Sequence, residues 1–205
     1  YYNTPETVTG AFSRGGVVFF AALYVSLMSL AEVSAAFGSR PILMKQKNYS
    51  LYHPSAHAIA NTVTSVPFNL FITIIFVVVL YFLSNLAREA GKFFICLLFI
   101  FLLSLTMSAM FNAISSINKT ISAANGMAGI LVLATLMYSS YMIQRPSMHP
   151  WFKWISYIDP LLYAFEAIIA TEFHGRKKAC DGSYLIPSGP EYANAPNSAR
   201  SCAFV

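Results

Sequence analysis

Long apolar runs separated by short polar segments dominate the pattern of hydrophobic and polar positions along this chain. The four runs cover residues 16–37, 58–84, 93–113 and 121–143. Each reaches about 20 residues, the length that a helix needs to cross the hydrocarbon core of a bilayer. Glu32 is the only charged side chain within the runs, so none has the wide polar face that a soluble helix presents to water. The pattern predicts an all-α integral membrane protein, a helical bundle in which four transmembrane helices are seen.

The composition supports a membrane class and argues against a nucleic-acid partner. Hydrophobic residues make up 57% of the chain and charged residues 10%, whereas soluble domains carry about 25% charged residues. The net charge of +5 comes from scattered Lys and Arg and not from a basic run of the kind that binds nucleic acid. The 205 residues suit one domain, and the polar start carries no signal peptide. We expect both ends to be cuts through a larger polypeptide.

The segments between the apolar runs alternate between the two sides of the membrane. Residues 38–57 share one side with residues 115–120, and residues 144–205 lie on the other. Lys and Arg are divided almost equally between the sides, so the positive-inside rule does not orient the chain. Cys180 and Cys202 flank a segment rich in Pro, Gly and Ser, with a spacing that suits a disulfide closing a loop of about 20 residues. A disulfide needs an oxidising compartment, which would make residues 144–205 extracellular; the alternative is two unpaired thiols.

One apolar stretch in the long final segment is too short to span the membrane. Trp151 and Trp154 recur at helical spacing, which is typical of the headgroup level. Asp159 and Pro160 then interrupt the helix, and only about 11 apolar residues follow, at 161–171. Two arrangements remain open for them: a re-entrant helix that dips into the outer leaflet, or an interfacial helix that lies flat.

Six short motifs along the chain carry a resemblance to a known family. They are SRGGVVFF at residues 13–20, RPILMKQK at 40–47, YHPSA at 52–56, WISYIDP at 154–160, EFHGR at 172–176 and IPSGP at 186–190. Together they resemble the transmembrane domain of ABC transporters of the G subfamily, and most closely the fungal pleiotropic drug resistance exporters. The resemblance covers essentially the whole chain.

The resemblance implies further parts of the protein. Such domains have six helices, so a first and a sixth helix are expected beyond the four seen here. It also implies a cytosolic nucleotide-binding domain that uses ATP and Mg, a second transmembrane half, and a multi-pass location in the plasma membrane. The ten glycines form no phosphate-binding loop, so we expect neither an ATP site nor another cofactor in this segment.

Residues 38–57 are predicted to contain a short amphipathic coupling helix on the cytosolic side. Arg40, Lys45 and Lys47 supply positive charge, and Tyr52 supplies an apolar anchor. Members of the resembled family place a coupling helix here, in contact with the ATP-binding domain. The alternative is a positively charged loop that only fixes the topology.

Glu32 lies within the first apolar run, near its cytosolic end. A carboxylate inside a membrane is costly, which makes it a functional candidate. We expect it to pair with Arg40 or Lys119 in a polar relay beside the coupling segment, as the resemblance also implies. The alternative is a side chain that reaches the cytosolic interface and is merely solvated.

Two apolar stripes, on the first and the fourth apolar runs, are candidates for the lining of a substrate cavity. Members of the family line their drug cavity from these two helices, and Met and aromatic side chains suit varied hydrophobic ligands. Tyr141 and Met142 match the position of the family's apolar plug above the cavity. The alternative for the stripes is plain packing between helices. The candidate lining residues are Phe20, Tyr24, Leu27, Met28, Ile130, Leu133, Leu136 and Met137.

The chain shows no pattern of an enzyme active site. Its four His residues do not converge at metal-ligand spacing, and the runs hold no activated nucleophile or paired carboxylates. The function that fits best is the transmembrane half of an ATP-driven exporter of hydrophobic compounds, drugs or lipids, within a parent polypeptide that hydrolyses ATP. A lipid or sterol translocator of the same family is the first alternative, followed by a non-transporting scaffold. A channel would need more intramembrane charge than Glu32 alone supplies.

Overall fold

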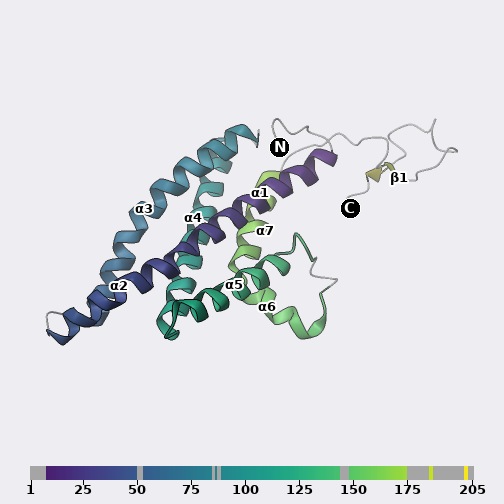
Figure 1. The fold of residues 1–205 in the computed structure, drawn as a ribbon. Coiled ribbons are helices and arrows are strands. Elements are labelled where there is room, and N and C mark those ends of the chain that lie inside the picture. Colours follow the sequence, from purple (N-terminus) through teal and green to yellow (C-terminus); the bar gives the residue numbers. More distant parts are fainter. Residues whose placement is uncertain are drawn as a thin grey trace.

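The computed structural model describes residues 8–49, 53–84, 86, 89–143, 148–174, 185–186 and 201–202. In chain order, the elements within these residues are α1 (Val8–Ser29), α2 (Ala31–Asn48), α3 (Pro54–Leu83), α4 (Ala90–Ile117), α5 (Ile121–Met137), the 3-10 turn η2 (Pro150–Phe152), α6 (Lys153–Ile158), α7 (Pro160–Phe173), β1 (Leu185–Ile186) and β2 (Ser201–Cys202). The two short strands pair in an antiparallel manner. Helices account for nearly all of the described chain, which confirms the predicted all-α membrane bundle (Figure 1).

Three helical stretches in the described part of the chain are long and apolar enough to cross a membrane. They are Ser13–Asn48, Ser55–Leu83 and Ala90–Ile117. The long helices run side by side, so the bundle has two ends (Figure 1). We call the end where α2 is followed by α3 the α2–α3 end, and the opposite end, where α3 is followed by α4, the α3–α4 end. The start of α1 lies at the α3–α4 end.

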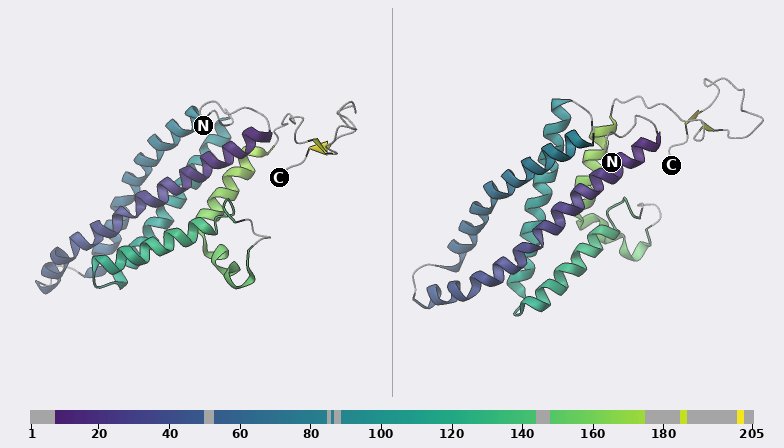
Figure 2. Two further views of the ribbon diagram at one scale, coloured as in Figure 1. Left: turned by 45° about the vertical axis from the view of Figure 1, so that its right-hand side comes forward. Right: turned by 45° about the horizontal axis from the view of Figure 1, so that its top comes forward.

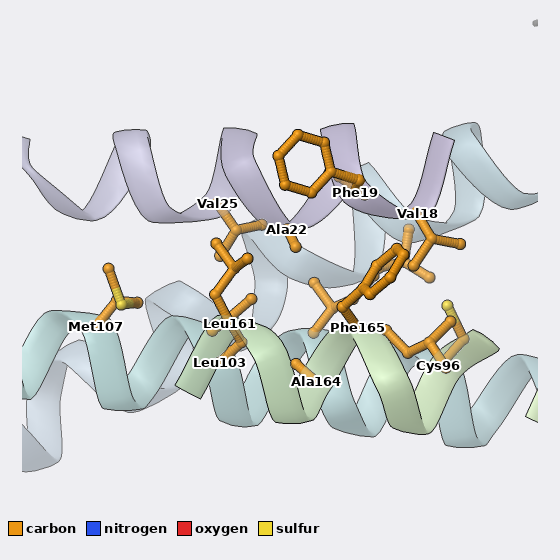
Figure 3. Packing of buried hydrophobic residues seen from close by; sticks show 14 of the residues in the cluster. Val18, Phe19, Ala22, Val25, Cys96, Leu103, Met107, Leu161, Ala164 and Phe165 are labelled. Atoms are coloured by element: carbon orange, nitrogen blue, oxygen red, sulfur yellow. The ribbon is translucent and has the colours of Figure 1, made fainter. Parts of the chain in front are cut away.

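The hydrophobic core lies where α1, α4 and α7 meet (Figure 3). Ala21 and Ala22 are fully buried on α1, and such small side chains let neighbouring helices approach closely in lipid. On the facing helices, Met107 and Leu161 are also fully buried. The core therefore joins α7, from the end of the sequence, to the first helix, which positions the site residues of both.

The first predicted span is divided into two helices at Leu30. α1 and α2 are separated only by Leu30, whose N–H donates to the carbonyl of Leu27 at 3.2 Å. The hydroxyls of Ser26 and Ser29 donate to carbonyls one turn earlier, at 2.8 and 3.0 Å. Such contacts bend helices, and here they coincide with the boundary between α1 and α2. The two helices still follow nearly one line in both further views (Figure 2).

The helix of the predicted coupling segment begins earlier than expected. It is not a separate element within residues 38–57, because α2 continues without interruption from Ala31 to Asn48. Pro41 lies inside α2, where it removes one backbone hydrogen bond. The positively charged segment is consequently a rigid extension of the first membrane helix.

The fourth predicted span, residues 121–143, is shorter than expected. α5 has 17 residues and ends at Met137, which corresponds to about 25 Å of helix, less than a bilayer core. The left-handed backbone of Ser140, with φ of 66°, is incompatible with a continuing helix. The apolar run therefore continues for six residues beyond the end of the helix.

α7 packs inside the bundle, antiparallel to α1 and α4. Its first turn is capped by Asp159, whose carboxylate accepts a hydrogen bond from Leu161 N–H at 3.0 Å. At its other end, Lys92 donates to the carbonyl of His174 at 3.2 Å, so α7 finishes beside the beginning of α4. This packing supports the re-entrant arrangement, and the depth of α7 in the membrane stays a prediction.

Candidate functional site

A polar cleft of about 350 Å³ opens among α2, α3 and α4 near the α2–α3 end. Glu32 on α2 and Asn112 on α4 line it, together with His57, Asn61 and Asn69 of α3. Polar side chains from three helices thus gather in one place within an otherwise apolar bundle. Such a concentration inside membrane helices makes the cleft a candidate functional site.

Glu32 connects α2 to α4. One of its carboxylate oxygens accepts hydrogen bonds from the Ser108 hydroxyl and from the Asn112 amide, the latter at 3.0 Å. Hydrogen bonds to a charged acceptor are stronger than those between neutral groups. The first turn of α2, immediately after the interruption at Leu30, is consequently held against α4.

Arg40 makes a second connection between the same two helices. Its guanidinium donates to the backbone carbonyls of Ser115 and Asn118, the latter at 2.8 Å, and lies 3.8 Å from the centre of the Phe37 ring. The guanidinium therefore satisfies carbonyls that the end of α4 leaves without intrahelical partners.

The expected ion pair between Glu32 and Arg40 or Lys119 is not formed among the residues that the structure describes. Glu32 and Arg40 are eight residues apart on one helix, a rise of about 12 Å, and each finds its own partner on α4. The prediction was wrong because it did not include Ser108 and Asn112. These two side chains lie within an apolar run and carried no charge signal.

The other predicted coupling residues lie on the exposed last turns of α2. Lys45 and Lys47 are exposed, as are the large apolar side chains of Met44 and Tyr49. Tyr52 lies outside the described residues. The tip of α2 at the α2–α3 end is thus exposed, and it carries both basic and large apolar side chains.

A buried ion pair at the α3–α4 end escaped the sequence-based reasoning. The Arg14 guanidinium lies 3.4 Å from the Glu172 carboxylate, and the two side chains are only 1% and 3% exposed. The pair joins the start of α1 to the last turn of α7. Both residues occur in motifs that were identified, SRGG and EFHG. A charged residue next to an apolar stretch was the sequence signal that could have indicated a buried pair.

The two stripes predicted to line a cavity lie largely on exposed faces of α1 and α5. Tyr24 is half-buried and stacks on Phe76 of α3, with ring centres 4.6 Å apart. Leu136 packs against the core. The remaining members are exposed: Phe20, Leu27, Met28, Ile130, Leu133 and Met137. The side chains are thus available to a partner, a ligand or lipid.

The two residues predicted to form an outer plug lie in different surroundings. Tyr141 stacks on Phe19 of α1 at 4.5 Å between ring centres and meets Phe165 of α7 edge-on at 5.7 Å. Met142 is exposed. Tyr141 therefore ties the end of α5 to the core, whereas Met142 is free to contact a partner.

The predicted disulfide falls largely outside the described residues. Cys180 is not among them, and Cys202 contributes its backbone to β2, where it pairs with Leu185 of β1. The pairing of the two thiols stays a prediction.

Comparison with known proteins places these features in a family. The chain matches the family model for the ABC-2 type transporter over residues 1–173. It is 52% identical over 205 residues to Protein SNQ2 of Saccharomyces cerevisiae, covering 100% of this chain and 14% of that protein. It is 51% identical over 205 residues to the ABC transporter ATP-binding protein/permease PDR18 of the same yeast, covering 100% of this chain and 15% of that protein.

A filamentous fungus supplies a further relative. The chain is 43% identical over 190 residues to the ABC multidrug transporter atrA of Aspergillus oryzae, covering 93% of this chain and 13% of that protein. The chain thus spans about one seventh of the length of these relatives. Its matched residues include all the helices described above, and it belongs to the ABC-2 type transporter family of membrane domains.

Proposed function

We propose that this chain forms part of the transmembrane half of an ATP-driven exporter of hydrophobic compounds, in the plasma membrane. The observation that carries the proposal is the nearly straight run of α1 and α2, which together form one candidate membrane span. It extends from the packed core, through the Glu32 and Arg40 connections, to the exposed basic tip at Lys45 and Lys47. A rigid element of this kind transmits the movement of a docked domain to the membrane core. The names of the relatives support an exported cargo of drugs.

The ATP-driven part of the mechanism lies outside this chain. ATP and Mg would be bound by a nucleotide-binding domain of the parent protein, which would dock on the tip of α2. Closure of that domain would push α2 along its axis and strain the hydrogen bonds that Glu32 and Arg40 make with α4. Because these contacts use side chains and backbone carbonyls at the surface of a cleft, they can be exchanged without unfolding either helix.

The substrate pathway would run along the exposed stripes of α1 and α5. A second transmembrane half facing these stripes would enclose Phe20, Leu27 and Met28 on one side and Leu133 and Met137 on the other. Thioethers and aromatic rings adapt to ligands of varied shape. Tyr141 and Met142, beyond the end of α5, would border the exit of this pathway. In this orientation residues 144–205 are extracellular.

Transport by inside-out membrane vesicles tests the proposal. The vesicles would carry the full-length parent protein and a fluorescent hydrophobic dye, with and without ATP. ATP-dependent uptake is expected to fall about tenfold when Phe20→Ala and Leu27→Ala are combined, since each removes about 1 kcal/mol or more of apolar contact. The matched control combines Phe71→Ala and Leu83→Ala, two exposed apolar residues of α3.

The outcome separates the possible functions. Equal losses in both double variants would remove the stripes from the pathway. Uptake of a fluorescent sterol or phospholipid in the absence of drug uptake would identify a lipid translocator of the same family. Vesicles that move neither class of compound with ATP would contradict export altogether.

A further inference from the structure

A groove of about 440 Å³ lies among α4, α5 and α6. Its walls are almost entirely apolar and include Met110 of α4, Ile130 and Ala134 of α5, and Trp154 and Ile158 of α6. Only Ile130 belongs to the stripes discussed above. The volume falls within the range of sites that bind drug-sized ligands.

One ionisable side chain lines this apolar groove. Asp159, at the junction of α6 and α7, is 1% exposed. Its Oδ1 accepts the hydrogen bond from Leu161 N–H that caps α7. Its Oδ2 is buried and has no hydrogen-bond partner among the residues that the structure describes. An unpartnered carboxylate oxygen in apolar surroundings is costly, and native proteins normally give such a group a donor or a countercharge.

The combination of shape and charge specifies the chemistry of an occupant. We propose that the groove binds an amphiphilic compound with one protonated amine, whose ammonium group donates to Asp159 Oδ2 while its apolar body fills the groove. The ammonium supplies both the missing donor and the missing positive charge.

A neutral alcohol of the same shape would supply only part of what the site lacks. Its hydroxyl would donate to the free oxygen, but the negative charge would remain uncompensated in an apolar site. The site therefore selects amines over alcohols. It goes beyond the proposed function, because binding here requires neither ATP nor movement of α2.

Photolabelling of the full-length parent protein in membranes tests the site. The probes are dodecylamine and dodecanol, each carrying a diazirine in the alkyl chain, and labelled positions are mapped by mass spectrometry. We expect the amine to label residues 127–134 and 154–158, and unlabelled dodecylamine to compete while dodecanol does not. Asp159→Asn keeps a side chain that caps helices well and removes the charge, so labelling by the amine should fall about tenfold or more.

A second variant addresses the groove without touching the carboxylate. Ala134→Phe fills the groove and should abolish labelling by the amine. Ala109→Phe places the same side chain on an exposed position of α4 outside the groove, and labelling should persist.

Several results would overturn the proposal. These are equal labelling of the native protein and the Asp159→Asn variant, equal labelling by the alcohol and the amine, and absence of label from both segments because another part of the protein covers them. Because labelling is measured without ATP, its result does not depend on whether the protein transports the dye. Loss of transport with intact labelling would contradict the proposed function alone.

Discussion

The two ends of the bundle are tied together by charged side chains in different ways. At the α3–α4 end, Arg14 and Glu172 form an ion pair that is almost completely buried. At the α2–α3 end, Glu32 and Arg40 bind hydroxyl, amide and carbonyl groups of α4 beside an open cleft. Both connections hold the first long helix, but the second borders a cleft of about 350 Å³, whereas the space beside Glu172 is only about 10 Å³.

This difference indicates which end of the first helix is free to move. Separating a buried ion pair exposes two charges to an apolar interior. Exchanging partly exposed hydrogen bonds for water or neighbouring partners costs about 1 kcal/mol each. The start of α1 is therefore locked to α7, whereas the tip of α2 can shift against α4 at a modest free-energy cost. A domain docked on that tip would act on the movable end.

The largest expected effect on stability comes from removing the buried ion pair at the α3–α4 end. Arg14→Met should lower the free energy of unfolding by about 3–5 kcal/mol, since it removes one member of a buried ion pair. Thermal unfolding of the full-length protein in detergent measures the loss. The combined Arg14→Met and Glu172→Gln variant should recover most of the stability. A single variant as stable as the native protein would show that the pair does not lock this end.

At the movable α2–α3 end, we expect a smaller loss of stability than at the α3–α4 end, but a larger effect on the coupling of ATP hydrolysis to transport. Glu32→Ala removes the acceptor shared by Ser108 and Asn112 and should cost about 1–2 kcal/mol, because water entering the cleft replaces part of the loss. Transport should fall more steeply than ATP hydrolysis in the same vesicles. Ser34→Ala is the control, since the Ser34 hydroxyl bonds only within its own helix. Parallel losses of transport and hydrolysis would contradict a coupling role.

The contrast between the two ends was only partly predictable. Apolar runs of sufficient length identify the membrane helices, because hydrocarbon thickness fixes helix length. The end of α5 was predicted six residues too late, since a left-handed Ser140 leaves no mark in an apolar sequence. The interruption at Leu30 was missed for a related reason: in a sequence, serines that donate hydrogen bonds to their own helix cannot be told from ordinary small residues.

Two charged members of the candidate site, Glu32 and Arg40, were predicted, but their partners and the other polar residues of the cleft were not. Glu32 and Arg40 were identified because charge in or near an apolar run is rare. Their partners are uncharged or are backbone carbonyls, and only the packing of α2 on α4 brings them together. The Arg14–Glu172 pair spans 158 positions of sequence, a separation over which residue patterns carry no pairing information.

Arg40 allows a finer test of the movable end. Arg40→Lys keeps the charge but loses the planar group that reaches two carbonyls of α4 and lies on Phe37. We expect a loss of about 1 kcal/mol in stability, measured by thermal unfolding, with reduced transport per ATP hydrolysed. Lys45→Ala removes a charge from an exposed position of the same helix and should leave stability unchanged. A fully functional Arg40→Lys variant would mean that positive charge alone suffices here.

The smallest effect is expected at Gly15, next to the locked pair. A methyl group added there would lie 3.8 Å from Tyr141 and 3.9 Å from Ile169, which is ordinary van der Waals contact. Alanine also favours a helix over glycine by about 0.5–1 kcal/mol, so Gly15→Ala should leave the melting temperature unchanged or raise it slightly. Gly15→Leu would reach further and displace Tyr141 from its stack on Phe19, lowering stability. A marked loss of stability in Gly15→Ala would mean that this end is held by close approach of the backbone at Gly15. The ion pair and its aromatic neighbours would then not be the main cause.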